Sequence, residues 1–288
     1  MALTINTNMP SLIAQRNLNN ATNELNTSIE RMSTGFKINH ASDNAAGYSI
    51  VTKWVTQLSS LDIASENAAT GTDLLKTAED NYSLITSHLQ RVRDLTEQAA
   101  NGTYGSDSKV AMKEEIEARL NEVDRIASNC EYNGVKLMDG SRTTAINLQV
   151  GIDGTTNSRI ALAATLFDSA KVVKLFGEGS TATSVAEKCT GTDTAHSDPS
   201  AMLTQIDTAI KTISTRVTKI GAATNQVSSA AEQISIQSEN ITASLSTLRD
   251  TDIASESSKY IQAQILQQAS ATLLSTANQL PSVALNLI

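Results

Sequence analysis

The sequence predicts a mainly α-helical fold, a long antiparallel helical bundle or coiled coil with a small β-hairpin region. Apolar residues recur at alternating steps of three and four over several unusually long stretches. Proline occurs only three times in 288 residues, and aromatic side chains make up 3% of them. Few helix breakers and few large side chains favour thin helical bundles over a thick globular core.

The longest of these patterns runs from Leu203 to Leu248. Thr224 and Ser238 are its polar positions, and Gly221 is its one residue of poor helix propensity. A continuous helix of roughly 70 Å follows from a rise of about 1.5 Å per residue. Such a helix cannot bury its apolar stripe against itself, so it requires partner helices along most of its length.

Two partner helices are predicted earlier in the chain. One follows Pro10, ends near Gly35, and is followed by the turn formers of 37–44. A second begins at Ala45 and stops at the breaker pair 101–102 (Asn-Gly). The seam predicted for the first helix consists of Leu18, Thr22, Leu25, Ile29, Met32 and Phe36.

A third helix is expected after the breaker pair, with Asp107 or Ser108 as its N-terminal cap. Cys130 stands at the end of its seam, where a small apolar residue belongs, so we interpret it as a packing residue. The sequence permits either a disulfide between Cys130 and Cys189 or two free thiols, and it contains no CxxC or metal-ligand spacing.

The helical period is lost beyond residue 133. Short strands are predicted over 135–138, 145–150 and 159–163, with turn signals at 139–140 and 153–154. The stretch 177–199 has no apolar period, so we expect an exposed loop or a very small cap there.

A last helix follows Asp252 or Thr251 as its cap, and no charged side chain occurs from Tyr260 to Ile288. Nor does one occur before Arg16. The seam predicted for the last helix consists of Ala263, Leu266, Ser270, Leu273, Ala277 and Leu280. Two uncharged amphipathic ends are predicted to pair as helices with each other and with copies of themselves. The residues expected to carry this polymerisation are Leu18, Leu25, Ile29, Met32, Ile261, Ile265, Leu266, Leu273, Leu274 and Leu280.

Composition and motifs exclude several classes of function. A net charge of −8 with no basic stripe argues against a nucleic-acid partner. The sequence shows no signal peptide and no apolar run of about 20 residues that could span a membrane. His40, His88 and His196 are isolated, and no catalytic, metal or cofactor motif accompanies them, so we predict that the chain is not an enzyme and needs no cofactor.

Four segments resemble the bacterial flagellins. They are the RMSTGFKIN block at 31–39 with SDNAAG at 42–47, the LQRVRDL block at 89–95 with QAANGT at 98–103, NGVKL at 133–137, and AQILQQA at 263–269 with ANQ at 277–279. The likeness covers roughly residues 1–167 and 202–288 and keeps the order that the family has.

This resemblance implies an extracellular subunit of the flagellar filament, exported unfolded through the flagellar type III apparatus without a cleaved signal peptide. Residues 1–44 and 249–288 would form a terminal polymerisation domain, the inner tube, whose ends pair as helices in the assembled filament. Residues 45–176 and 200–248 would form a helical middle domain, the outer tube, with β-hairpins at about 135–163. Residues 177–199 would be a short variable loop.

Partners are implied by the same resemblance. They include copies of the chain itself, an export chaperone, and the cap and hook-associated proteins. Toll-like receptor 5 recognition maps onto Gln90, Arg91, Val92, Leu95 and Glu115. The segment from about Gln264 resembles the part sensed by cytosolic inflammasome receptors. A hook-filament junction protein and a helical signalling module are the alternatives to a filament subunit.

Overall fold

A computed structural model describes residues 7–192 and 199–285, with side chains up to residue 279. It divides into two compact units, Met1–Leu58 with Glu239–Ile288, and Ser59–Ser238. The helices α2 (Ala45–Ala100) and α6 (Pro199–Arg249) each contribute to both units. The expected domain division falls instead at the ends of these helices, so it stays a prediction.

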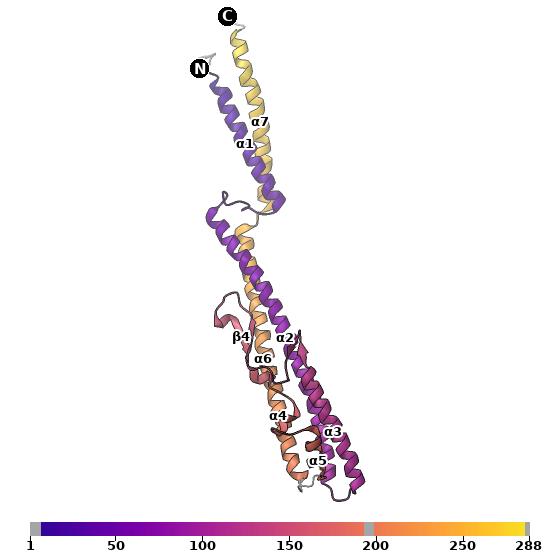
Figure 1. The fold of residues 1–288 in the computed structure, drawn as a ribbon. Coiled ribbons are helices and arrows are strands. Elements are labelled where there is room, and N and C mark those ends of the chain that lie inside the picture. The colour runs from indigo at the N-terminus through magenta and orange to yellow at the C-terminus, as the bar shows by residue number, and fades with distance from the viewer. Residues whose placement is uncertain (1–6, 193–198, 286–288) are drawn as a thin grey trace. The chain divides into compact units, whose positions relative to one another are not determined.

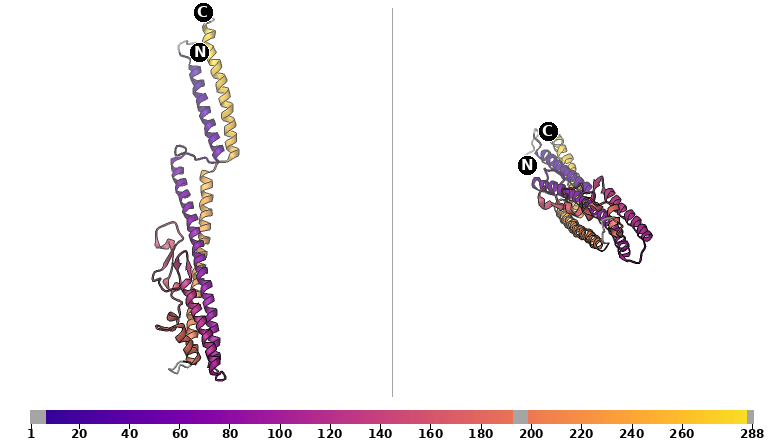
Figure 2. Two further views of the ribbon diagram at one scale, coloured as in Figure 1. Left: turned by 45° about the vertical axis from the view of Figure 1, so that its right-hand side comes forward. Right: turned by 60° about the horizontal axis from the view of Figure 1, so that its bottom comes forward.

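In the first unit, α1 (Met9–Thr34) and α7 (Ile253–Leu285) lie side by side and run in opposite directions, as Figures 1 and 2 show. Gly35 ends α1 in the left-handed conformation (φ 76°), and its N–H donates to the carbonyl of Arg31. Asp252 caps α7 as predicted, because its carboxylate accepts from the N–H groups of Ala254 and Ser255.

Two connecting segments of the first unit are tied together next to this helix pair. The N–H of Lys37 donates to the carbonyl of Arg249 at 2.7 Å, and the N–H of Thr251 donates to that of Gly35 at 2.9 Å. The guanidinium of Arg249 lies 3.5 Å from the ring centroid of Phe36. Both chain segments therefore enter and leave the helix pair at a fixed position.

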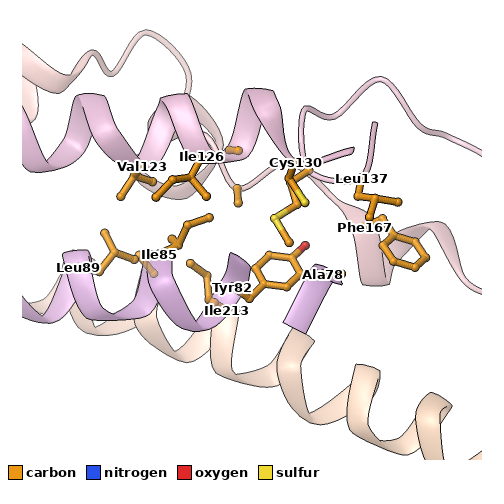
Figure 3. Close-up of a cluster of buried hydrophobic side chains, with 14 of the residues drawn as sticks. Ala78, Tyr82, Ile85, Leu89, Val123, Ile126, Cys130, Leu137, Phe167 and Ile213 are labelled. Carbon is orange, nitrogen blue, oxygen red and sulfur yellow. The ribbon is translucent and has the colours of Figure 1, made fainter. Parts of the chain in front are cut away.

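The second unit is built around α2, α3 (Ser106–Asn129) and α6, which share one hydrophobic core. Figure 3 shows Tyr82, Ile85, Val123 and Ile213 in this core, with Cys130 among them. Both cysteines are free and buried, so the packing interpretation of Cys130 is confirmed. The predicted caps of α3 are wrong: Gly105 takes the cap position, with no side-chain hydrogen bond.

Two antiparallel strand pairs follow α3. They are β1 (Glu131–Tyr132) with β2 (Val135–Lys136), and β3 (Ile146–Gln149) with β4 (Arg159–Leu162). Asn133 and Gly134 form the first turn with positive φ values of 48° and 76°, a conformation that Asn-Gly adopts readily. The β-hairpin region is confirmed. The predicted strand over 135–138 is too long, and β1 was not predicted.

The prediction of an exposed loop over 177–199 is wrong for its middle part. Residues Ala182–Thr190 form α5, which packs against α3 and buries Val185 and Cys189. The apolar residues 182, 185, 186 and 189 have helical spacing, but surrounding Gly, Ser and Thr residues hide it. Short elements connect α5 to the hairpins: η1 (Thr156–Ser158), η2 (Ala164–Phe167) and α4 (Val172–Phe176). Residues 193–198 lie outside the described part.

In the threonine-rich helices, threonine hydroxyl groups donate hydrogen bonds to backbone carbonyls of the same helix. The Oγ1 of Thr224 donates to the carbonyl of Ile220 at 3.0 Å, one turn earlier in α6. Thr86 in α2 makes the same bond to Tyr82 at 2.8 Å. Because these hydroxyls need no other partner, polar residues can occupy positions next to an apolar seam.

Candidate functional site

Among the side chains that the structure describes, the α1–α7 pair buries only small ones between its helices, apart from one carboxylate. Each helix places them at intervals of seven residues, as an antiparallel heptad seam requires. Small residues at the contact allow two helices to approach closely. The buried residues are Ala14, Ala21 and Ser28 on α1, and Glu256, Ala263, Ser270 and Ala277 on α7.

Large apolar side chains lie outside this seam and face solvent. Leu273 is 62% exposed and Ile265 is 60% exposed. The exposed set on the two helices comprises Met9, Leu12, Ile13, Ile29, Ile253, Ile261, Ile265, Leu266 and Leu273. Four others that the sequence predicts for polymerisation, Leu18, Leu25, Met32 and Leu274, are half-buried beside the seam.

The predicted seams were therefore partly wrong. Ile29 was placed on the seam of α1, and Leu266 and Leu273 on that of α7, but these three side chains point away from the partner helix. Apart from Glu256, the buried positions between the closely packed helices are occupied by Ala and Ser. The repeat of small residues every seven positions in both segments was the signal that could have identified the seam. The side chain of Leu280 lies outside the described residues.

One charged group interrupts the seam. Glu256 is 3% exposed and accepts hydrogen bonds from Ser28 Oγ (2.8 Å) and Lys259 Nζ (3.1 Å), with Arg31 3.9 Å away. Burial raises the pKa of this carboxyl, but the bonds from Ser28 and Lys259 and the two positive charges outweigh it, so the net pKa is lowered. Glu256 is thus held as a carboxylate.

A second surface combines residues of α2 and α3. Arg91 donates from Nε and NH2 to the two carboxylate oxygens of Glu115, at 2.9 and 3.3 Å. Hydrogen bonds from Arg91 lower the pKa of Glu115, so both groups stay charged. Gln90 is exposed beside them, whereas Val92 (0%) and Leu95 (3%) are buried in the core.

The described side chains contain no group of three or more His, Cys, Asp or Glu residues that could hold a metal ion. None of the helices within 7–192 and 199–285 combines the length and apolarity needed to cross a membrane.

Comparison with known proteins shows the family to which the chain belongs. The model of the bacterial flagellin N-terminal helical region matches residues 5–143, and that of the C-terminal helical region matches residues 203–288. A flagellin of Halalkalibacterium halodurans is 32% identical over 284 residues, which cover 99% of each chain. The chain belongs to the bacterial flagellin family.

Two further similarities cover smaller parts of this chain. The B-type flagellin of Pseudomonas aeruginosa is 45% identical over 151 residues, which cover 52% of this chain and only 31% of that longer protein. A solved structure of a putative flagellar hook-associated protein from Vibrio parahaemolyticus has a TM-score of 0.59 at 12% identity, covering 72% of this chain and all of that one. This second likeness concerns the fold alone.

Flagellins are the structural subunits of the extracellular flagellar filament, which forms by self-polymerisation. This flagellin is therefore a structural protein and not an enzyme. Its match to another flagellin over nearly the full length of both chains also separates it from the helical signalling module considered as an alternative.

Proposed function

We propose that the large apolar side chains on the outside of the α1–α7 pair are the contacts through which copies of this flagellin polymerise. The observation that carries the proposal is their exposure on two helices whose outer ends carry no charged side chain: α1 has none before Arg16, and α7 has none from residue 260 onward. Each such side chain contributes roughly 1.5–3 kcal/mol when fully buried. Several of them per subunit therefore provide a strong drive toward assembly.

Electron microscopy of the purified full-length protein, with and without short flagellar seeds, tests this proposal. Leu273→Asp should abolish elongation because each contact would then bury an unpaired carboxylate, whereas Leu273→Met conserves volume and apolarity and should elongate normally. Circular dichroism checks that both variants keep their helices. Normal filaments from Leu273→Asp, with helicity unchanged, would refute a role for this surface.

By family membership we also propose export through the flagellar type III apparatus without a cleaved signal peptide. The partners would be an export chaperone and the cap and hook-associated proteins. The uncharged C-terminal segment supports the proposal of a chaperone, because a partner must cover its exposed apolar surface before the subunit assembles. Failure of the full-length chain to reach the medium of a strain that has this export apparatus would contradict the proposal.

A second candidate function is recognition by Toll-like receptor 5, centred on Gln90, Arg91 and Glu115. The exposed ion pair between Arg91 and Glu115 supports it, because a receptor can bind two charged groups presented by adjacent helices. Since Val92 and Leu95 are buried, we propose that they position α2 rather than touch the receptor. Recognition of the segment from Gln264 by inflammasome receptors is the corresponding proposal for α7.

A receptor-reporter cell assay with monomeric protein tests the charged pair. Arg91→Ala should lower signalling at least about tenfold, since charged hydrogen bonds contribute roughly 1.5–3 kcal/mol each. The control is Arg125→Ala, which removes a different exposed arginine, one that lies on α3. Equal signalling by the two variants would refute the assignment.

A further inference from the structure

The seam between α1 and α7 does not by itself define one alignment of the two helices. Counting by heptads from Ser28 and Glu256 places Ala21 near Ala263 and Ala14 near Ser270. If α7 slid by one heptad, Ser28 would meet Ala263, Ala21 would meet Ser270, and Ala14 would meet Ala277. Every contact would again join two small residues, so apolar packing distinguishes the two alignments only weakly.

Glu256 differs between these alignments. In the observed one its carboxylate is buried and satisfied by Ser28 and Lys259. After a slip of one heptad it would lie beyond the end of α1 or opposite Ala21, and the bond from Ser28 would be lost. A buried carboxylate that loses a hydrogen-bond donor is strongly disfavoured.

The remaining side-chain bonds between the helices are less discriminating. Asn8 Nδ2, at the N-cap of α1, donates to the backbone carbonyl of Ala277 at 2.7 Å. Thr22 accepts from Gln267 at 3.2 Å, and Ser11 donates to Asn278 at 2.7 Å. These groups are partly or fully exposed, so water can replace either partner after a slip.

Backbone bonds join residues 35–37 to 249–251 at one end of the pair and favour the observed alignment there. We infer that Glu256, through its buried bond with Ser28, is the side chain within the seam that selects the register of the α1–α7 pair. Register decides which large apolar side chains of α1 lie beside those of α7 on the outer surface. Glu256 is thus a positioning residue for assembly, and in that respect the inference rests on the proposed function. A single buried polar group at a heptad position can specify alignment in this way.

Cysteine crosslinking measures the register directly. In the full-length chain, Thr22→Cys with Gln267→Cys reports the observed alignment. The pairs Thr22→Cys with Tyr260→Cys and Thr22→Cys with Leu274→Cys report slips of one heptad in either direction. Cys130 and Cys189 are buried, and single-cysteine variants control for them.

With Glu256 present, only the 22–267 pair should crosslink efficiently. Glu256→Ala should raise the ratio of slipped to observed crosslinks on the order of tenfold, the effect of losing one charged hydrogen bond. Ser28→Ala should act in the same direction. Glu24→Ala removes an exposed carboxylate from α1 and should leave the ratio unchanged.

A residue that only stabilised the pair would lower the 22–267 yield without raising either slipped yield, and that result would overturn the inference. Efficient slipped crosslinks in the chain that retains Glu256, or failure of the 22–267 pair to crosslink in that chain, would also overturn the inference. Electron microscopy of the unsubstituted chain with seeds separates this inference from the proposed function. If the 22–267 crosslink forms but the unsubstituted chain never elongates seeds, the proposed assembly surface is wrong and the register assignment stands.

Discussion

Leu148 on β3 packs against Gly71 in the middle of α2, in the space that a Cβ at residue 71 would occupy. Nearby, Asn67 Nδ2 donates to the carbonyl of Gln149 at 3.0 Å. Glycine lowers helix stability by roughly 1 kcal/mol relative to alanine. At residue 71 this loss is offset by the close approach of the β3–β4 hairpin, because the missing Cβ lets Leu148 pack directly against α2.

Gly71→Ala should therefore destabilise the protein by about 1–2 kcal/mol, because overpacking outweighs the gain in helix propensity. Gly221→Ala in α6 is the matched control, since a Cβ there meets no atom within 4 Å, and it should stabilise by about 0.5–1 kcal/mol. Urea unfolding of both variants measures the difference. If both substitutions stabilise the protein, the packing of Leu148 does not require a glycine at residue 71.

The two thiols should be unreactive in the folded chain. Burial raises the pKa of Cys130 and of Cys189 to about 11 each, from 9.0, which lowers their thiolate fractions near pH 8 on the order of a hundredfold. Reaction with a disulfide reagent should therefore be slow in buffer and fast in denaturant. Rapid labelling of two thiols in buffer would contradict the buried positions.

The terminal helix pair should weaken in acid through Glu256. Its folded pKa is lowered from 4.5, so its contribution to stability is present above pH 4.5 and is lost as the pH falls through the folded pKa. Other carboxylates titrate in the same range, so the informative quantity is the difference in unfolding free energy between the unsubstituted chain and Glu256→Gln. That difference should shrink below pH 4.5; a constant difference would contradict the assignment.

Long-range periodicity made the helices predictable, but it did not reveal which residues face each other. A heptad pattern gave α6 within a few residues, because one continuous stripe of apolar side chains identifies a helix without reference to its partner. The same criterion misplaced Ile29 and Leu273, since it assigns the largest apolar residue to the contact. The paired ends follow a different rule, in which close approach selects alanine and serine.

The candidate sites divide in the same way. Arg91 and Glu115 are 24 residues apart in the chain and are joined only when α2 and α3 pack, so resemblance identified each residue but not the bond between them. Resemblance also cannot separate a residue that touches a partner from one that supports the helix. Burial is the observation on which we propose the supporting role for Val92 and Leu95.

Tyr82 provides a test of how the loop after β4 is held in place. Its side chain lies in the core shown in Figure 3. Its hydroxyl donates to the carbonyls of Leu166 and Asp168, at 3.0 and 3.2 Å, and burial raises its pKa to about 12. Arg216 donates to the carbonyls of Asp168 and Ser169, both at 3.0 Å. Hydrogen bonds from Tyr82 on α2 and Arg216 on α6 thus hold the loop around residues 166–169 against these two helices.

Tyr82→Phe keeps the ring but leaves the carbonyl of Leu166 without this donor, so it should cost about 1–3 kcal/mol of unfolding free energy. Tyr104→Phe removes the hydroxyl of a tyrosine that is 40% exposed and should change stability by less than about 0.5 kcal/mol. Urea unfolding followed by circular dichroism measures both values. Equal stability of the two variants would mean that the bonds from Arg216 alone hold the loop.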